Sequence, residues 1–231
     1  MFWLSESKNS LQTEEENILM KRKIIGYYNY TVILTYTGML LACIGVFCSI
    51  NEKYFWAVLL LMLAGICDMF DGAVASTNKK RDKNEKYFGI QIDSLSDLVS
   101  FGVLPAIFVY VIAKSGLPSI IAACVYILAA LIRLAYFNVL EEERQSSKST
   151  QRKVYLGVPV TTIALVMPVF YILFANGIIK NTVLFVVMLL VMAIGFVSPL
   201  EIKKPALAGK IIMIVIGVAE LVGMLLFRGA L

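Results

Sequence analysis

Four aspartates at two helical spacings are the residues of this sequence best suited to chemistry. Asp68 and Asp71 stand three positions apart, and Asp93 and Asp97 stand four apart. Both spacings place the two side chains of a pair on one face of an α-helix. Only the short segment 76–88 joins the two helices, so the two pairs are expected to face each other. Four carboxylates at close range repel one another unless cations lie between them.

The donor atoms favour hard divalent cations. The sequence has no histidine, which excludes His-ligated zinc, Ser-His-Asp hydrolysis and histidine proton relays. Carboxylate oxygens without His or Cys favour Mg²⁺ or Mn²⁺, and four of them suit a site for two cations. Such a site can bind a diphosphate and polarise it for displacement. Gly72 and Gly89 flank the two pairs, and their missing side chains leave room for a ligand near the backbone.

The composition indicates that these aspartates lie in a membrane. Of 231 residues, 59% are apolar and 16% are charged, and the mean hydropathy is +0.81. A soluble domain has about a quarter of its residues charged, so a soluble enzyme, a disordered regulator and a free-standing nucleic-acid binder are excluded. Stretches of about 20 mostly apolar residues are predicted to span the bilayer. They are Thr31–Ile50, Phe55–Ala75, Ser94–Ala113, Ser119–Leu140, Leu156–Asn176, Thr182–Val197 and Leu207–Phe227.

The charges predict how these spans are oriented. Most of the 21 basic residues fall on one side of the spans, the side of the N-terminus, and basic loops face the cytoplasm. The basic surplus is therefore a topology signal, and no nucleic-acid partner is expected. The sequence predicts an all-α integral membrane protein, a bundle of about seven transmembrane helices in a prokaryotic cell membrane with a cytoplasmic N-terminus. Asp68 lies about 18 Å along its helix from the interfacial Trp56, within the inner half of the bilayer.

The aspartate motif resembles the signature of the CDP-alcohol phosphatidyltransferase family, D-x-x-D-G-x-x-A-R, a spacer, and G-x-x-x-D-x-x-x-D. The two matching segments of this chain are Asp68-Met69-Phe70-Asp71-Gly72-Ala73-Val74-Ala75 and Gly89-Ile90-Gln91-Ile92-Asp93-Ser94-Leu95-Ser96-Asp97. The chain departs from the pattern at two points. Ser76 stands where the family has Arg, and the spacer is longer than the usual one, with the excess in a basic run.

The resemblance implies a role for each aspartate. Asp68, Asp71 and Asp93 would bind two divalent cations, Mg²⁺ or Mn²⁺. Asp97 would complete the shell of the second cation and would act as the general base that takes the proton of the attacking hydroxyl. The active site would face the cytoplasm.

The resemblance also implies where the nucleotide substrate binds. The residues expected to shape the pocket for the cytidine nucleotide are Asp68, Asp71, Gly72, Ala75 and Gly89. The basic run of the long spacer could supply the charge that Ser76 lacks, or it could only mark the cytoplasmic side. Its candidate phosphate-binding residues are Lys79, Lys80 and Arg81.

Segments that flank the motif resemble the phosphatidylserine synthases of this family. They are Asp93–Ala106, Arg133–Asn138, Tyr155–Pro159, Val197–Pro199 and Lys203–Pro205. A guanidinium within a span needs an anion, so Arg133 is expected to pair with a phosphate, with a serine carboxylate, with one of the aspartates, or in a purely structural ion pair. Asn138 could donate a hydrogen bond to the substrate or cap the end of its helix.

The resemblance implies a metal-dependent enzyme that transfers the phosphatidyl group of CDP-diacylglycerol to L-serine and releases CMP. It also implies a homodimer. Residues 1–30 would form a cytoplasmic or interfacial segment, 31–205 the catalytic transmembrane domain, and 206–231 an additional helix. One alternative is the same chemistry on glycerol 3-phosphate or an inositol. An alternative of another class is a cation- or proton-coupled transporter, whose intramembrane acids would relay ions.

Overall fold

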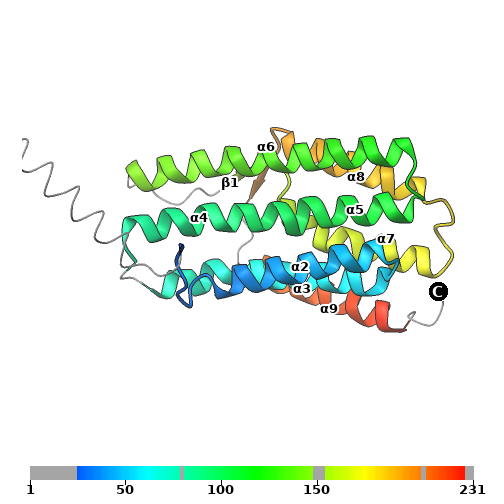
Figure 1. The fold of residues 1–231 in the computed structure, drawn as a ribbon, viewed down its shortest axis with the longest axis horizontal. Helices are drawn as coiled ribbons and strands as arrows, with labels where there is room; N and C mark the ends of the chain where they lie inside the picture. Colours follow the sequence, from blue (N-terminus) through cyan, green and yellow to red (C-terminus); the bar gives the residue numbers. More distant parts are fainter. Residues whose placement is uncertain (1–24, 79–80, 148–153, 204–206, 227–231) are drawn as a thin grey trace, which may run out of the picture.

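The computed structural model describes residues 25–78, 81–147, 154–203 and 207–226. These residues form an elongated bundle of helices that run roughly along its long axis (Figure 1). The first half of the chain contributes α2 (Ile33–Ile50), α3 (Tyr54–Thr77), α4 (Lys83–Asp97), the π-helix η1 (Leu98–Val103), α5 (Leu104–Ile112) and α6 (Leu117–Ser147). The second half contributes β1 (Val154–Leu156), the 3₁₀-helix η2 (Val160–Thr162), α7 (Ile163–Ala175), α8 (Val183–Val197), β2 (Glu201–Lys203) and α9 (Leu207–Leu226).

The helices have the length and surface of a multi-pass membrane protein. Among the described residues, four helices are long and apolar enough to cross a bilayer, namely α2, α3, the continuous helix Lys83–Ile112 and the Leu117–Glu143 part of α6. Three shorter apolar stretches belong to α7, α8 and α9. The outer faces carry large apolar side chains such as Phe47 and Ile194, each 66% exposed. A continuous apolar surface of this kind suits lipid and not water.

The predicted spans correspond to these helical stretches, but three predicted boundaries are wrong. The third span begins at Lys83 and not at Ser94, because Asp82 caps a polar first turn by accepting a 2.6 Å hydrogen bond from the Glu85 N–H. The fourth runs to Ser147, since its polar residues after Leu140 remain helical. The fifth begins only at Val160, because a strand and a glycine turn precede it.

A short antiparallel pairing of β1 with β2 is the feature that the all-α prediction omits. Tyr155 lies opposite Ile202 in this pairing. The chain then turns at Gly157, whose φ is +75° and whose N–H donates to the Leu200 carbonyl at 2.8 Å. A Cβ at this glycine would lie 2.6 Å from the Phe196 carbonyl oxygen, so no other residue fits the turn.

The π-helix η1 lies inside the third span, directly after Asp97. Pro105 has no N–H to donate to the Phe101 carbonyl, the acceptor four residues earlier. The hydroxyl of Tyr126 on α6 donates to that carbonyl at 2.7 Å, and both residues are fully buried. The Leu104 N–H instead reaches the Val99 carbonyl, five residues earlier. A tyrosine of the neighbouring helix thus satisfies the acceptor that the proline leaves free.

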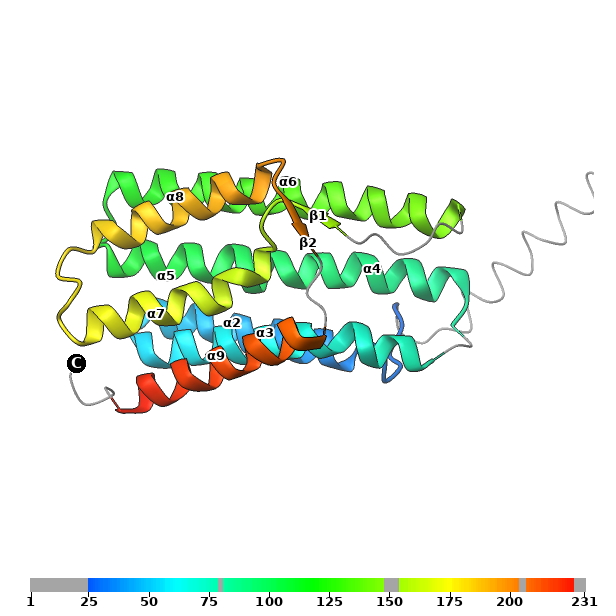
Figure 2. The ribbon, with the colours of Figure 1, turned by 180° about the vertical axis from the view of Figure 1, so that it is seen from behind.

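The bundle has two unequal halves along its length. In both views, α4 and α6 extend well beyond α7, α8 and α9, which cover only one half (Figures 1 and 2). A Cβ at Gly65 of α3 would lie 2.9 Å from the Ala164 Cβ near the start of α7, so the two helices touch there. Asp68 and Asp71 lie about one and two turns further along α3, where α7 no longer covers it.

Candidate active site

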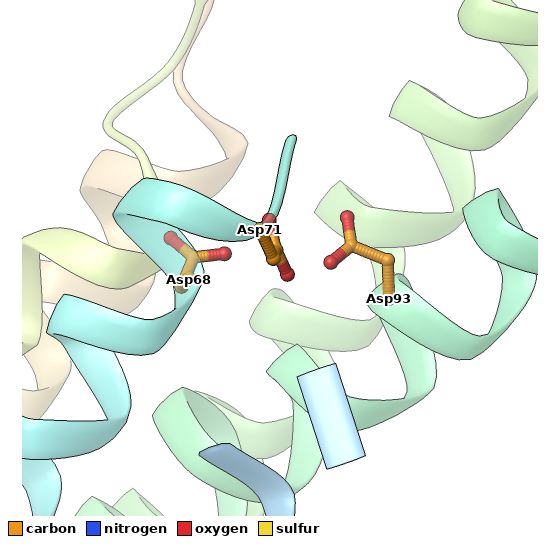
Figure 3. Close-up of side chains that lie close together, drawn as sticks. All are labelled: Asp68, Asp71 and Asp93. Atoms are coloured by element: carbon orange, nitrogen blue, oxygen red, sulfur yellow. The ribbon is translucent and has the colours of Figure 1, made fainter. Parts of the chain in front are cut away.

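The structure brings three of the predicted aspartates into one cluster. Asp68 and Asp71 extend from α3 and Asp93 extends from α4, and their carboxylates point toward one another (Figure 3). One carboxylate oxygen of each lies within 4.8 Å of the other two. Asp71 is buried, and the other two side chains are half-buried. The expectation that the two helices present their acids to each other is confirmed for these three residues.

Asp97 lies beside this cluster and not within it. It is the last residue of α4, one turn beyond Asp93, and η1 begins directly after it. Its carboxyl group is in hydrogen-bonding contact with that of Asp68. Asp97 therefore contacts the cluster at Asp68.

The surroundings of the four carboxylates fit divalent cations. In the described part of the chain, the groups that act on them are the other aspartates, the Thr35 hydroxyl and the Gly72 backbone, and no lysine or arginine is among them. The alternative that these carboxylates are paired with a basic side chain thus has no support in the described residues. Carboxylate oxygens on two helices form the hard donor set that Mg²⁺ and Mn²⁺ prefer.

Open space at Gly72 and a small pocket both adjoin the cluster. Gly72 is exposed, and a Cβ built on it would meet no atom within 4 Å. The pocket lies between α2, α3 and the third span, and its polar lining consists of Thr35, Cys67, Asp68, Asp71, Ser96, Asp97 and Ser100. A ligand could therefore approach the α3 backbone at Gly72 while its charged group faces the carboxylates.

The structure shows what two residues of the altered signature do. Ser76, which replaces the family arginine, donates its hydroxyl to the Ala73 carbonyl at 2.6 Å and is thus turned back onto its own helix. Arg81 lies against α4, because a Cβ at Gly89 would be 3.4 Å from the Arg81 Nη1. Gly89 lies one turn before Asp93, so this guanidinium lies near the edge of the acidic cluster. Ala75 is half-buried.

Two other predicted phosphate-binding residues, Lys79 and Lys80, lie outside the described residues. The candidates on α6 are described. Arg133 is 9% exposed, and its guanidinium carbon lies 4.5 Å from the centre of the Phe137 ring, a cation–π contact. The N–H groups of a guanidinium lie in its plane, so an anion would bind along its edge.

Asn138 links α6 to α4. Its side-chain oxygen accepts a 2.6 Å hydrogen bond from the Ser94 hydroxyl, and its Nδ2 donates to the Gln91 side chain at 3.3 Å. The alternative that Asn138 caps the end of its helix is wrong, because α6 continues to Ser147. Ser94 follows Asp93 directly, so this network holds the α4 segment that carries the second half of the acidic motif.

Several residues of the site were missed by sequence reasoning. The polar contacts of Thr35, Gln91, Ser94 and Ser96 join helices that are 36 to 61 positions apart in the chain. One signal was present for two of them, since Ser94 and Ser96 are small hydroxyl residues between two aspartates in an otherwise apolar span. For Thr35 no local pattern could have shown the partner, because Asp71 lies 36 positions further along the chain.

Comparison with known proteins agrees with this geometry. The sequence model of the CDP-alcohol phosphatidyltransferase family matches residues 28–197, which contain all four aspartates and end at the last residue of α8. The chain belongs to this family. The match covers α2 to α8 and leaves α9 outside, so the whole acidic site lies within the family region.

Curated relatives carry more specific names. The chain is 30% identical over 199 residues to the CDP-diacylglycerol–serine O-phosphatidyltransferase of Methanocaldococcus jannaschii, covering 86% of this chain and 83% of that protein. It is 29% identical over 164 residues to the enzyme of the same name from Saccharomyces cerevisiae, covering 69% of this chain and 58% of the yeast protein. The archaetidylserine synthase of Methanothermobacter thermautotrophicus is 30% identical over 152 residues, covering 65% of this chain and 61% of that protein.

Proposed function

We propose that this protein transfers the phosphatidyl group of CDP-diacylglycerol to the hydroxyl of L-serine, giving phosphatidylserine and CMP. The observation that carries the proposal is the acidic cluster, in which three aspartates of the family signature meet from two helices and the fourth lies in contact with them. The names of relatives that match at about 30% identity support serine as the acceptor. The reaction would be a step of phospholipid synthesis within the membrane.

In this mechanism Asp97 accepts the proton of the serine hydroxyl. The serine oxygen forms a bond to the phosphorus next to the diacylglycerol, and the bond from that phosphorus to the oxygen of the CMP phosphate breaks. The proton moves to Asp97, and CMP leaves with the bonding electron pair. A carboxylate within hydrogen-bonding reach of the attacking hydroxyl suits a general base. We assign this role to Asp97 because it contacts Asp68 and lies outside the group of three aspartates that could share a cation.

Asp68, Asp71 and Asp93 would hold two divalent cations, Mg²⁺ or Mn²⁺, and Asp97 would complete the ligand set of the second cation. Such cations, when bound, offset the charge of the diphosphate and of the departing CMP. The carboxylates fix the place of the diphosphate, because they would hold the cations that attract it at the meeting point of α3 and α4 (Figure 3). Without that charge balance, the diphosphate would be repelled by the aspartates.

The nucleotide would lie along α3 and α4 at their two signature glycines. Gly72 offers open space beside Asp71, and Gly89 lets the Arg81 guanidinium approach α4 closely. We assign to Arg81 the contact with the diphosphate that Ser76 cannot make, because Ser76 is bonded to its own helix. Arg suits this role since its planar fork can donate two hydrogen bonds to one phosphate. Ala75, Lys79 and Lys80 complete the proposed nucleotide and phosphate contacts.

The serine acceptor would be bound from the α6 side. Arg133 carries a buried positive charge that can pair with the serine carboxylate, and Asn138 holds Ser94 beside Asp93. This arrangement places the carboxylate-binding group and the general base on neighbouring helices. The cytoplasmic orientation of the site and a homodimer stay predictions.

The proposal is tested by offering the purified protein several acceptors. CDP-diacylglycerol and Mn²⁺ or Mg²⁺ are supplied with L-serine, glycerol 3-phosphate or inositol, and CMP release is followed. We expect rapid CMP release with L-serine alone. Release only with glycerol 3-phosphate or inositol would replace the acceptor and keep the chemistry. If no acceptor led to CMP release, the protein would not be a transferase of this kind.

A further inference from the structure

We propose that Thr35 is a positioning residue for the cation site, acting through Asp71. The inference rests on the metal site of the proposed function. Thr35 belongs to the first span and is 7% exposed, and it is not part of the family signature. Its hydroxyl donates a hydrogen bond to Asp71 Oδ2 at 3.1 Å. Asp71 is itself the most buried member of the three-aspartate cluster.

This hydrogen bond determines how Asp71 presents its oxygens. A carboxylate on a helix can rotate about its last torsion angle, and that torsion has a broad distribution when nothing holds it. The Thr35 hydroxyl holds one oxygen, so the plane of the carboxylate and the direction of the other oxygen are fixed. Partners of this kind orient metal ligands, and their removal typically weakens metal affinity or activity about 10- to 100-fold.

A second hydrogen bond connects the same residue to the other half of the motif. The Thr35 carbonyl accepts from the Ser96 hydroxyl at 3.2 Å, and both residues are buried. Ser96 directly precedes Asp97 on α4. The side chain of Thr35 thus holds an aspartate of α3, and its backbone holds the residue beside an aspartate of α4. One residue of α2 therefore sets the spacing between the two helices that supply all four carboxylates.

The competing explanation is that Thr35 only fills space and satisfies its own buried hydroxyl. The two explanations predict opposite orders for two substitutions. Thr35→Val keeps the volume and loses the donor, whereas Thr35→Ser keeps the donor and loses a methyl group. If Thr35 acts by hydrogen bonding, the valine variant is the impaired one. If it acts by packing, the serine variant is.

The experiment measures Mn²⁺ binding to the purified full chain without substrate, by electron paramagnetic resonance of the free ion. We expect Thr35→Val to raise the Kd for Mn²⁺ about 10- to 100-fold, and Thr35→Ser to stay within about threefold of the unmodified chain. Thr37→Val is the matched control. Thr37 lies on the same helix, is exposed, and bonds only the Ile33 carbonyl of its own helix. Its substitution should leave the Kd unchanged.

Mn²⁺ binding by Thr35→Val as tight as that of the unmodified chain would overturn the inference. So would a larger loss in Thr35→Ser than in Thr35→Val. If the valine variant does not fold, as judged by gel filtration, Thr35→Ser decides alone, and a tenfold weaker Kd there overturns the inference. An unmodified chain that binds Mn²⁺ but releases no CMP with serine refutes the proposed reaction and not the role of Thr35. An unmodified chain that binds no Mn²⁺ overturns both.

Discussion

The two halves of the bundle are built on different principles. In the half covered by α7, α8 and α9, aromatic rings gather around the fully buried Phe185, with ring centres 5.8 to 6.1 Å from those of Phe108, Phe170 and Phe174. In the other half, α3 and α4 bring three carboxylates within 4.8 Å of one another, and Gly72 faces open space. One half holds the helices together, and the other half keeps their polar groups close and accessible.

This difference explains how the chain can hold several mutually repelling carboxylates within a membrane. Contacts of aromatic side chains join α5, α7 and α8 at one end, and we expect them to supply much of the packing that holds the bundle together. The acidic end can then be arranged for chemistry. Substitutions in the two halves should accordingly change different quantities. Those in the aromatic half should lower stability, and those in the acidic half should lower turnover.

The largest expected effect is on turnover in the acidic half. Asp97→Asn keeps the shape of the side chain but removes the carboxylate that we propose as the general base. We expect CMP release with serine to fall about 10²- to 10⁴-fold, with the thermal unfolding temperature unchanged. The measurement is the initial rate of CMP release, and the unfolding curve is its control. A variant that keeps more than a tenth of the activity would remove Asp97 from the role of general base.

The next effect is on stability in the aromatic half. Phe185→Ala empties a site that touches Phe108, Phe170 and Phe174. We expect a loss of about 3 kcal/mol, at the lower end of the range for Phe→Ala, because lipid and not water surrounds the helices. Mn²⁺ affinity of the folded protein should be unchanged. Denaturation in mixed detergent measures the first quantity, and a weaker Kd for Mn²⁺ without loss of stability would contradict the division into two halves.

The smallest effects are expected when two glycines of α3, Gly65 and Gly72, are each replaced by alanine. Gly65→Ala places a Cβ 2.9 Å from the Ala164 Cβ and should destabilise the protein by about 1–3 kcal/mol. Gly72→Ala meets no atom within 4 Å and should stabilise the helix by about 0.5–1 kcal/mol. The KM for CDP-diacylglycerol should rise about tenfold, about 1.4 kcal/mol, in Gly72→Ala.

Unfolding curves and substrate titrations of these two glycine variants measure both quantities. If Gly72→Ala left the KM unchanged, the open space at Gly72 would not be part of the nucleotide site. If Gly65→Ala were as stable as the unmodified chain, the close approach of α3 and α7 would not contribute to the stability of the bundle.

Much of this arrangement could be predicted from the sequence, because it depends on local patterns. Apolar length predicted where each span lies in the chain, and the i,i+3 and i,i+4 spacings of the aspartates predicted their common faces. The predicted boundaries were wrong where a helix continues into a polar segment, as at Lys83 and beyond Leu140. Hydropathy alone does not distinguish a polar helical extension from a loop.

The remainder depends on contacts between distant segments. The bond from Thr35 to Asp71 and the bond from Tyr126 to the Phe101 carbonyl join different helices. Pro105 leaves the Phe101 carbonyl without its helical donor, and which residue satisfies that carbonyl depends on how α6 packs on the third span. The pairing of β1 with β2 was likewise invisible, because each strand has only three residues.

The central claim is that the two aspartate pairs form one metal-dependent site for transfer to serine. The most direct test follows both products from CDP-diacylglycerol and isotopically labelled L-serine, before and after removal of divalent cations with a chelator. The account predicts labelled phosphatidylserine and CMP in equal amounts, neither after chelation, and recovery of both when Mn²⁺ is restored. CMP without labelled phosphatidylserine, or equal turnover in the presence of the chelator, would contradict it.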